Sequence, residues 1–139
     1  MTELLTKAEY SALADSLDLP RSPFIDGKYQ IGHGPVMETS NPATGAIIAQ
    51  ISTANAQDVD FAVAKARESF DTGCWSKMDP DARKDVLIRL CKLITRNKRE
   101  LAVMESVESG KPILDGETID LPETIHCIKW HAEATDKIY

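Results

Sequence analysis

The sequence from Asn55 to Gly73, NAQDVDFAVAKARESFDTG, decides how the rest of the chain is interpreted. Its apolar residues recur at the spacing of an α-helix and place Val59, Val63 and Phe70 on one stripe. Asn55 can accept a hydrogen bond from the first helical turn, and Gly73 can adopt the left-handed conformation that ends a helix. The stretch therefore predicts one amphipathic helix with both ends defined.

Helical periodicity continues to the end of the chain. A second helix is predicted to start at Asp79-Pro80, because proline at the first helical position has no N–H to leave unbonded. Its expected buried stripe consists of Leu87, Leu90, Cys91 and Ile94. A third helix is predicted over residues 100–107, closing at Gly110-Lys111-Pro112, and a fourth begins near Asp120.

The sequence before the first of these helices favours strands and tight turns. Asp26-Gly27 suits a two-residue hairpin turn, because both residues tolerate a positive φ. Two further strands are predicted over residues 36–39 and 46–51, on either side of a turn at 41–45. Between these strand regions, the run Gly32-His33-Gly34-Pro35 predicts a mobile connection.

The order of these elements predicts the α/β class, with N-terminal β-hairpins followed by four helices and no β-α-β alternation. Residues 1–23 are interpreted as an N-terminal extension that carries a short helix, and residues 24–139 as the main folded part. The last amphipathic pattern is still running at Tyr139 without a Gly, Asn or Pro to close it. We therefore expect the sequence to be the truncated front of a longer protein.

The composition is typical of an ordinary soluble domain, with 42% hydrophobic and 27% charged residues. There is no apolar run of membrane-spanning length and no signal-peptide pattern, so we expect a cytoplasmic protein without a membrane partner. A net charge of -6 argues against nucleic acid as a partner. The basic run Arg96-Asn97-Lys98-Arg99 is interpreted as charge that complements a helix dipole rather than as a nucleic-acid contact.

The three cysteines, Cys74, Cys91 and Cys127, are too widely and irregularly spaced for a disulfide framework or a zinc site. Cys91 lies on the apolar stripe of its helix, so a small buried hydrophobe is favoured over a catalytic nucleophile. Ser109-Gly110-Lys111-Pro112 lacks the earlier glycine and the following hydroxyl residue of a phosphate-binding loop. None of these features predicts a catalytic site by itself.

Several segments taken together resemble the aldehyde dehydrogenase superfamily in their order and spacing. They are Phe24-Ile25-Asp26-Gly27-Lys28, the turn from Thr39 to Gly45 (TSNPATG), Asp58-Val59-Asp60, Glu108-Ser109-Gly110-Lys111-Pro112, and the stretch from Ile128 to Tyr139 (IKWHAEATDKIY). The last stretch is similar to the helix that precedes the oligomerisation strands, especially in the branch acting on γ-glutamylaminobutyraldehyde and related aminoaldehydes. The resemblance implies that residues 24–139 are the incomplete N-terminal part of a Rossmann-type cofactor-binding domain.

The same resemblance implies an enzyme that uses NAD or NADP to oxidise an aldehyde, such as an aminoaldehyde, to a carboxylic acid. In this family a cysteine thiolate adds to the aldehyde, hydride passes to the nicotinamide, and a glutamate activates water to hydrolyse the thioester. The family's catalytic and main cofactor-binding residues all fall beyond Tyr139, so the chain alone is expected to be inactive. A homodimer or homotetramer is implied for the full-length enzyme. The competing interpretation is a stand-alone, non-catalytic interaction or structural domain.

Family members often bind a structural sodium or potassium ion, and the resemblance maps its ligands to Thr39, Ser40 and Glu108. A turn carbonyl and a carboxylate supply the oxygen ligands that a hard cation prefers. Glu108 stands where the family usually has an aspartate and is one methylene longer. If an ion binds, we expect Glu108 to draw back or a water to intervene.

The start of the last helix lines the substrate tunnel in relatives, and this position maps to Ile119, Asp120 and Glu123. One hypothesis is that these carboxylates attract the cationic end of an aminoaldehyde. The alternative is that they are carboxylates favoured at a helix start by the macrodipole.

Overall fold

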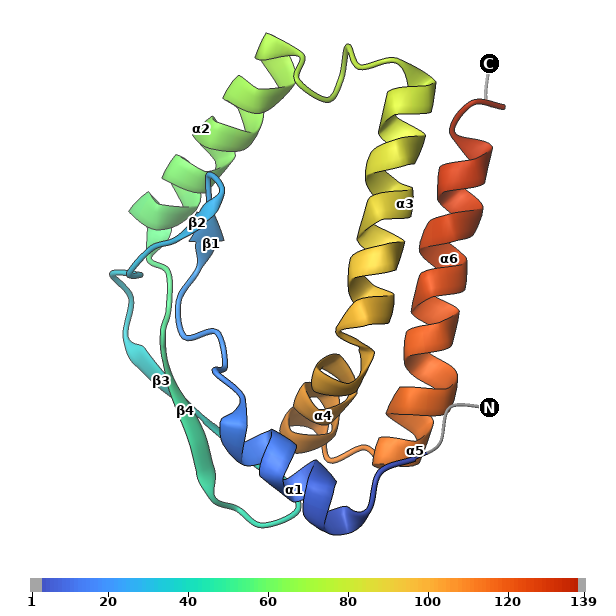
Figure 1. Ribbon diagram of the computed structural model, residues 1–139. Coiled ribbons are helices and arrows are strands. Elements are labelled where there is room, and N and C mark those ends of the chain that lie inside the picture. The colour runs from blue at the N-terminus through green and yellow to red at the C-terminus, as the bar shows by residue number, and fades with distance from the viewer. Residues whose placement is uncertain (1–3, 138–139) are drawn as a thin grey trace. The chain divides into compact units, whose positions relative to one another are not determined.

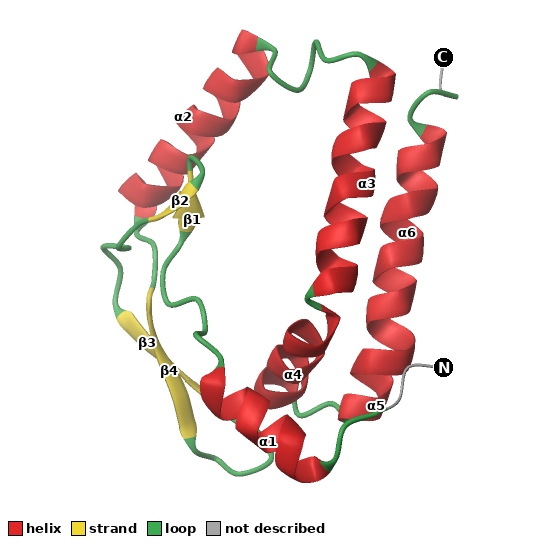
Figure 2. Ribbon diagram, viewed as in Figure 1, coloured by secondary structure: helices red, strands yellow, loops and turns green. Residues whose placement is uncertain are grey.

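The computed structural model describes residues 4–137, which form two compact units. Unit 1 combines the N-terminal residues up to Asp18 with those from Asp79 onward, and unit 2 runs from Leu19 to Met78. The helical elements are α1 (Lys7–Ser16), α2 (Ala56–Thr72), α3 (Pro80–Arg96), α4 (Lys98–Ser109), α5 (Ile113–Asp115), the π-helical segment η1 (Gly116–Asp120) and α6 (Leu121–Ala134). The strands are β1 (Phe24–Ile25), β2 (Lys28–Tyr29), β3 (Val36–Ser40) and β4 (Ile47–Ser52) (Figures 1 and 2).

Unit 2 holds all of these strands, as two separate antiparallel hairpins. The turn of the β1–β2 hairpin is Asp26-Gly27, with φ values of 55° and 77°. Positive φ at both central residues is the requirement of a tight hairpin turn, and glycine meets it without a Cβ penalty. The predicted turn and the predicted pair of later strands are both confirmed.

The connection between the two hairpins is fixed by hydrogen bonds. The N–H of Gly34 donates to the carbonyl of Thr53 at 2.8 Å. A Cβ added to Gly32 would lie 2.1 Å from the same carbonyl oxygen, so this glycine permits a close approach of two backbones. The glycines of this connection therefore permit close packing, and its mobility stays a prediction.

Helix α2 has the ends that the sequence predicts. The Asn55 side chain accepts a hydrogen bond from the N–H of Asp58 at 3.0 Å, and the Asp58 carboxylate accepts one from the N–H of Asn55 at 2.9 Å. Gly73 closes the helix in the left-handed conformation. The Asp58 carboxylate also accepts from the N–H of His33 at 2.8 Å and contacts its ring Nδ1 at 2.7 Å. One side chain therefore starts the helix and anchors the connection that precedes β3.

Unit 1 is built on α3 and α6, which run side by side (Figure 1). The ammonium of Lys84 on α3 bridges Glu133, at 2.8 Å, and Asp136, at 3.6 Å, beside the end of α6. Cys91 is buried as predicted, and Leu90 on the same expected stripe is 42% exposed. Among the described residues of unit 1, the other buried apolar side chains are Ala102, Val103 and Ala132. No helix within residues 4–137 is long and apolar enough to cross a membrane.

The approach to α6 contains a π-helical segment that the sequence did not predict. The N–H of Leu121 donates to the carbonyl of Gly116, five residues back. Pro122 follows and has no N–H for the carbonyl four residues back, where its ring would also clash in a regular α-helix. The wider π turn accommodates this proline, and single π turns of this kind are frequent at functional sites.

Candidate functional site

The structure brings together the three residues predicted to face a substrate. Ile119 and Asp120 close the π-helical segment, and Glu123 lies in the first turn of α6. The Ile119 side chain is 54% exposed, although it is apolar. These residues form a short surface composed of one aliphatic side chain and two carboxylates.

The two carboxylates differ in their partners. Asp120 is half-buried and forms an ion pair with Lys111, and this contact is the main reason that the pKa of the Lys111 ammonium is raised. The side chain of Glu123 is 74% exposed and lies 3.9 Å from the Nδ1 of His126. The charge of Asp120 is therefore largely neutralised within the chain, whereas that of Glu123 is offered to solvent.

The residues of the predicted cation site lie in different units, and each is described by itself. Thr39 and Ser40 end β3, where the pairing with β4 has a register shift between them. Glu108 is exposed near the end of α4. No cluster of three or more His, Cys, Asp or Glu side chains suited to a metal occurs among residues 4–137. The cation site stays a prediction.

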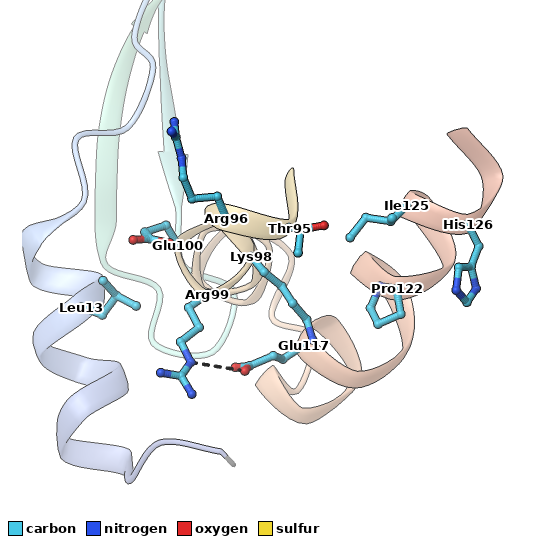
Figure 3. A pocket seen from close by; sticks show the side chains of 10 residues that line it. All are labelled: Leu13, Thr95, Arg96, Lys98, Arg99, Glu100, Glu117, Pro122, Ile125 and His126. Atoms are coloured by element: carbon cyan, nitrogen blue, oxygen red, sulfur yellow. Dashed lines mark hydrogen bonds and ion pairs between the residues drawn. The ribbon is translucent and has the colours of Figure 1, made fainter. Parts of the chain in front are cut away.

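Sequence reasoning missed a cavity of about 680 Å³ in unit 1 and the carboxylate in its wall (Figure 3). The cavity lies among α1, the junction of α3 with α4, the π-helical segment and the first turns of α6. Its lining residues are Leu13, Thr95, Arg96, Lys98, Arg99, Glu100, Glu117, Pro122, Ile125 and His126. The basic run at residues 96–99, interpreted from sequence only as helix-end charge, supplies three of these side chains.

Glu117 in this wall is fully buried. The hydroxyl of Tyr10 on α1 donates to its Oε2 at 2.5 Å, and Nε of Arg99 on α4 donates to its Oε1 at 3.5 Å. Burial, followed by the hydrogen bond to Glu117, raises the pKa of the Tyr10 hydroxyl. A buried carboxylate needs such partners, since an unpaired buried charge is strongly unfavourable. Figure 3 shows the Arg99 and Glu117 side chains directed toward each other.

No local sequence signal marks this contact. Tyr10 and Glu117 are 107 residues apart, and each lies in a segment whose polar residues are otherwise those of a helix surface. Only the tertiary fold pairs them.

Comparisons with known proteins show what this chain is similar to. The sequence profile described as the aldehyde dehydrogenase family matches residues 30–139. The aminoacetaldehyde dehydrogenase of Pseudomonas aeruginosa is 49% identical over 140 residues, which cover 100% of this chain and 28% of that protein. The NADP/NAD-dependent aldehyde dehydrogenase PuuC of Escherichia coli is 38% identical, over 89% of this chain and 25% of its own length.

Solved structures agree with the sequence matches. The γ-glutamyl-γ-aminobutyraldehyde dehydrogenase of Burkholderia cenocepacia is 38% identical and superimposes with a TM-score of 0.93, covering 96% of this chain and 27% of that one. An indole-3-acetaldehyde dehydrogenase of P. syringae, solved with NAD+, is 35% identical with a TM-score of 0.94, covering 98% of this chain and 28% of its own. The chain thus spans about a quarter of the length of the relatives it matches.

Proposed function

The chain belongs to the aldehyde dehydrogenase family, and from this premise we propose that it forms part of an NAD- or NADP-dependent enzyme that oxidises an aldehyde to a carboxylic acid. The observation that carries the proposal is the family match over residues 30–139, together with the same fold in solved aldehyde dehydrogenases. The relatives include proteins named for an aminoaldehyde and for a γ-glutamylated aminoaldehyde, which supports substrates of this class.

Residues 4–137 do not form a dinucleotide site of their own. Doubly wound folds bind dinucleotides in a crevice at the carboxyl ends of parallel strands. The strands within residues 4–137 form two antiparallel hairpins, so no such crevice is present there. The cofactor is therefore assigned to the complete protein, and the role proposed for this chain is on the substrate side.

On that side, we assign the selection of cationic aldehydes to Glu123. Its exposed carboxylate provides negative charge at the start of α6, beside the exposed aliphatic side chain of Ile119. Asp120, which the sequence-based hypothesis treated as an equal partner, already neutralises Lys111 and contributes less. A negative surface at a substrate entrance raises the local concentration of cationic substrates.

The test is the kinetics of Glu123→Gln in the complete enzyme, with an aminoaldehyde and a neutral aldehyde of similar length. We expect kcat/KM for the aminoaldehyde to fall by about threefold to tenfold, the effect of one partly screened charge, with little change for the neutral aldehyde. Added salt should reduce the difference between the substrates. Lys129→Gln, an exposed site further along α6, is the matched control. An equal change for both substrates would show that Glu123 has no part in selection.

Three further assignments stay predictions: the monovalent cation at Thr39, Ser40 and Glu108, the homodimeric or homotetrameric state, and the cytoplasmic location.

A further inference from the structure

We propose that Glu117 is a positioning residue, whose buried carboxylate joins α1 to α4 and holds the π-helical turn that presents Ile119 and Asp120. The inference rests on the proposed function only in treating the start of α6 as the substrate-facing surface. The geometry of the turn itself does not depend on that assignment.

The Glu117 carboxylate is buried away from water. Among residues 4–137, Glu117 is the ionisable side chain that is fully buried, with no exposed surface. Such a group is stable only where hydrogen bonds and an opposite charge replace water. Tyr10 and Arg99 supply these contacts, so removing either partner leaves a buried carboxylate with one contact fewer and favours its rotation toward solvent.

Glu117 lies inside the π turn itself. It is the second residue of the π-helical segment, and its neighbour Gly116 packs on Ala102 of α4. Gly116 and the Glu117 side chain hold the turn on α4 from adjacent positions. If the Glu117 side chain rotates outward, the backbone of this turn therefore has to move. Ile119 and Asp120 follow in the same turn and would move with it.

The partner of Glu117 on α1 comes from a distant part of the chain. Tyr10 lies on α1, whose 10 residues include none that is buried. The helix therefore has little apolar burial to hold it, and the hydrogen bond to a charged, buried acceptor is a large part of its attachment. Docking of α1 and the geometry of the π turn are coupled through one carboxylate.

The first experiment measures backbone hydrogen exchange in the whole 139-residue chain. The N–H of Leu121, which donates to the carbonyl of Gly116, reports the π turn directly. In Tyr10→Phe we expect exchange at Leu121 and Asp120 to accelerate roughly tenfold or more, the effect of losing a hydrogen bond to a charged group. Tyr29→Phe, at a tyrosine that is 61% exposed in unit 2, is the matched control and should leave these amides unchanged.

A second variant, Glu117→Gln, keeps an acceptor of similar size and removes the charge. The pKa of Tyr10, read from the ultraviolet absorbance of the tyrosinate, should fall part of the way toward its ordinary value in this variant, because the Glu117 charge is lost while burial remains. Acceleration in Tyr10→Phe confined to α1, or no acceleration at Leu121 at all, would overturn the proposal. An unchanged pKa of Tyr10 in Glu117→Gln would also overturn the proposal, because the Tyr10 hydroxyl would then not respond to the charge of Glu117.

Kinetics in the complete enzyme separate positioning from simple loss of structure. Tyr10→Phe is expected to raise KM for the aldehyde by about threefold to tenfold with kcat preserved, because a displaced surface weakens substrate binding without altering the chemistry. A fall in kcat at constant KM indicates fewer folded molecules and would contradict the positioning role. Failure of the proposed substrate selection would appear instead as equal effects of Glu123→Gln on both aldehydes, with the exchange result unaffected.

Discussion

Three carboxylates of similar intrinsic chemistry have different tasks because their surroundings differ. Glu117 is buried between a tyrosine and an arginine, Glu123 is in solvent, and Asp58 accepts hydrogen bonds at the start of α2. Burial and donors fix the first and third in position. Exposure leaves Glu123 free to meet a ligand.

Asp58 makes unit 2 sensitive to acid. Hydrogen bonds from the N–H of His33, and then from that of Asn55, lower its pKa from 3.8 to about 2. Because the folded pKa is depressed, the stability that the carboxylate contributes is present above pH 3.8 and is lost as the pH falls through about 2.

We therefore expect the stability of unit 2 to fall as the pH drops from 3.8 to about 2. Urea titrations at successive pH values measure this change. Asp58→Asn should unfold at lower urea and show a flatter acid dependence. Asp60→Asn, at an exposed position on the same helix, is the control. If both variants keep the wild-type acid profile, the hydrogen bonds of Asp58 do not set it.

Gly32 tests the close approach between the hairpins. An alanine there would place its Cβ 2.1 Å from the carbonyl oxygen of Thr53, and backbone cannot move aside cheaply. We expect Gly32→Ala to lower the free energy of unfolding by about 3 kcal/mol, measured in urea. Gly45→Ala, at a turn glycine with φ of 73° and open space around it, should cost only about 1 kcal/mol of left-handed strain. A smaller effect at Gly32 than at Gly45 would contradict the steric explanation.

The packing of α4 against the π-helical segment can be tested from both sides. Ala102 has no exposed surface, so Ala102→Leu is expected to lower the free energy of unfolding by about 1–3 kcal/mol through overpacking. Gly116 has helical φ and ψ, and a Cβ there would meet Ala102 at ordinary contact distances of 3.6–3.8 Å. Gly116→Ala is therefore expected to raise stability by about 0.4–1 kcal/mol, because it restricts the unfolded chain. Thermal and urea unfolding measure both changes in stability. A stabilising Ala102→Leu together with a destabilising Gly116→Ala would contradict the close packing of Gly116 on Ala102.

The elements that the sequence predicted correctly have local causes. Asp26-Gly27 makes its turn, Asn55 and Gly73 cap α2, and Pro80 starts α3, because each acts on its own few residues of backbone. The π-helical segment and the pairing of Tyr10 with Glu117 depend on tertiary contacts, so no local pattern marked them. The candidate surface at 119–123 came from family resemblance, and the different partners of its carboxylates required the fold.

At the level of the molecule, the apolar stripe of α2 is exposed. Val59, Val63 and Phe70, on the apolar stripe of α2, are 52%, 62% and 60% exposed. An amphipathic helix gains most of its stability by burying such a stripe. The chain spans about a quarter of the length of the relatives that share this fold.

The 139-residue chain alone is expected to lack catalytic activity. Its hairpins form no crevice for a dinucleotide within residues 4–137, Cys91 is buried, and none of the three cysteines is expected to be the family nucleophile. We expect no NADH formation from an aminoaldehyde, followed by absorbance, and no heat of NAD binding in calorimetry. The aminoacetaldehyde dehydrogenase of P. aeruginosa serves as the positive control. NADH production by the chain that disappears in Cys74→Ser or Cys127→Ser would place a nucleophile here and overturn the assignment of catalysis to the rest of the protein.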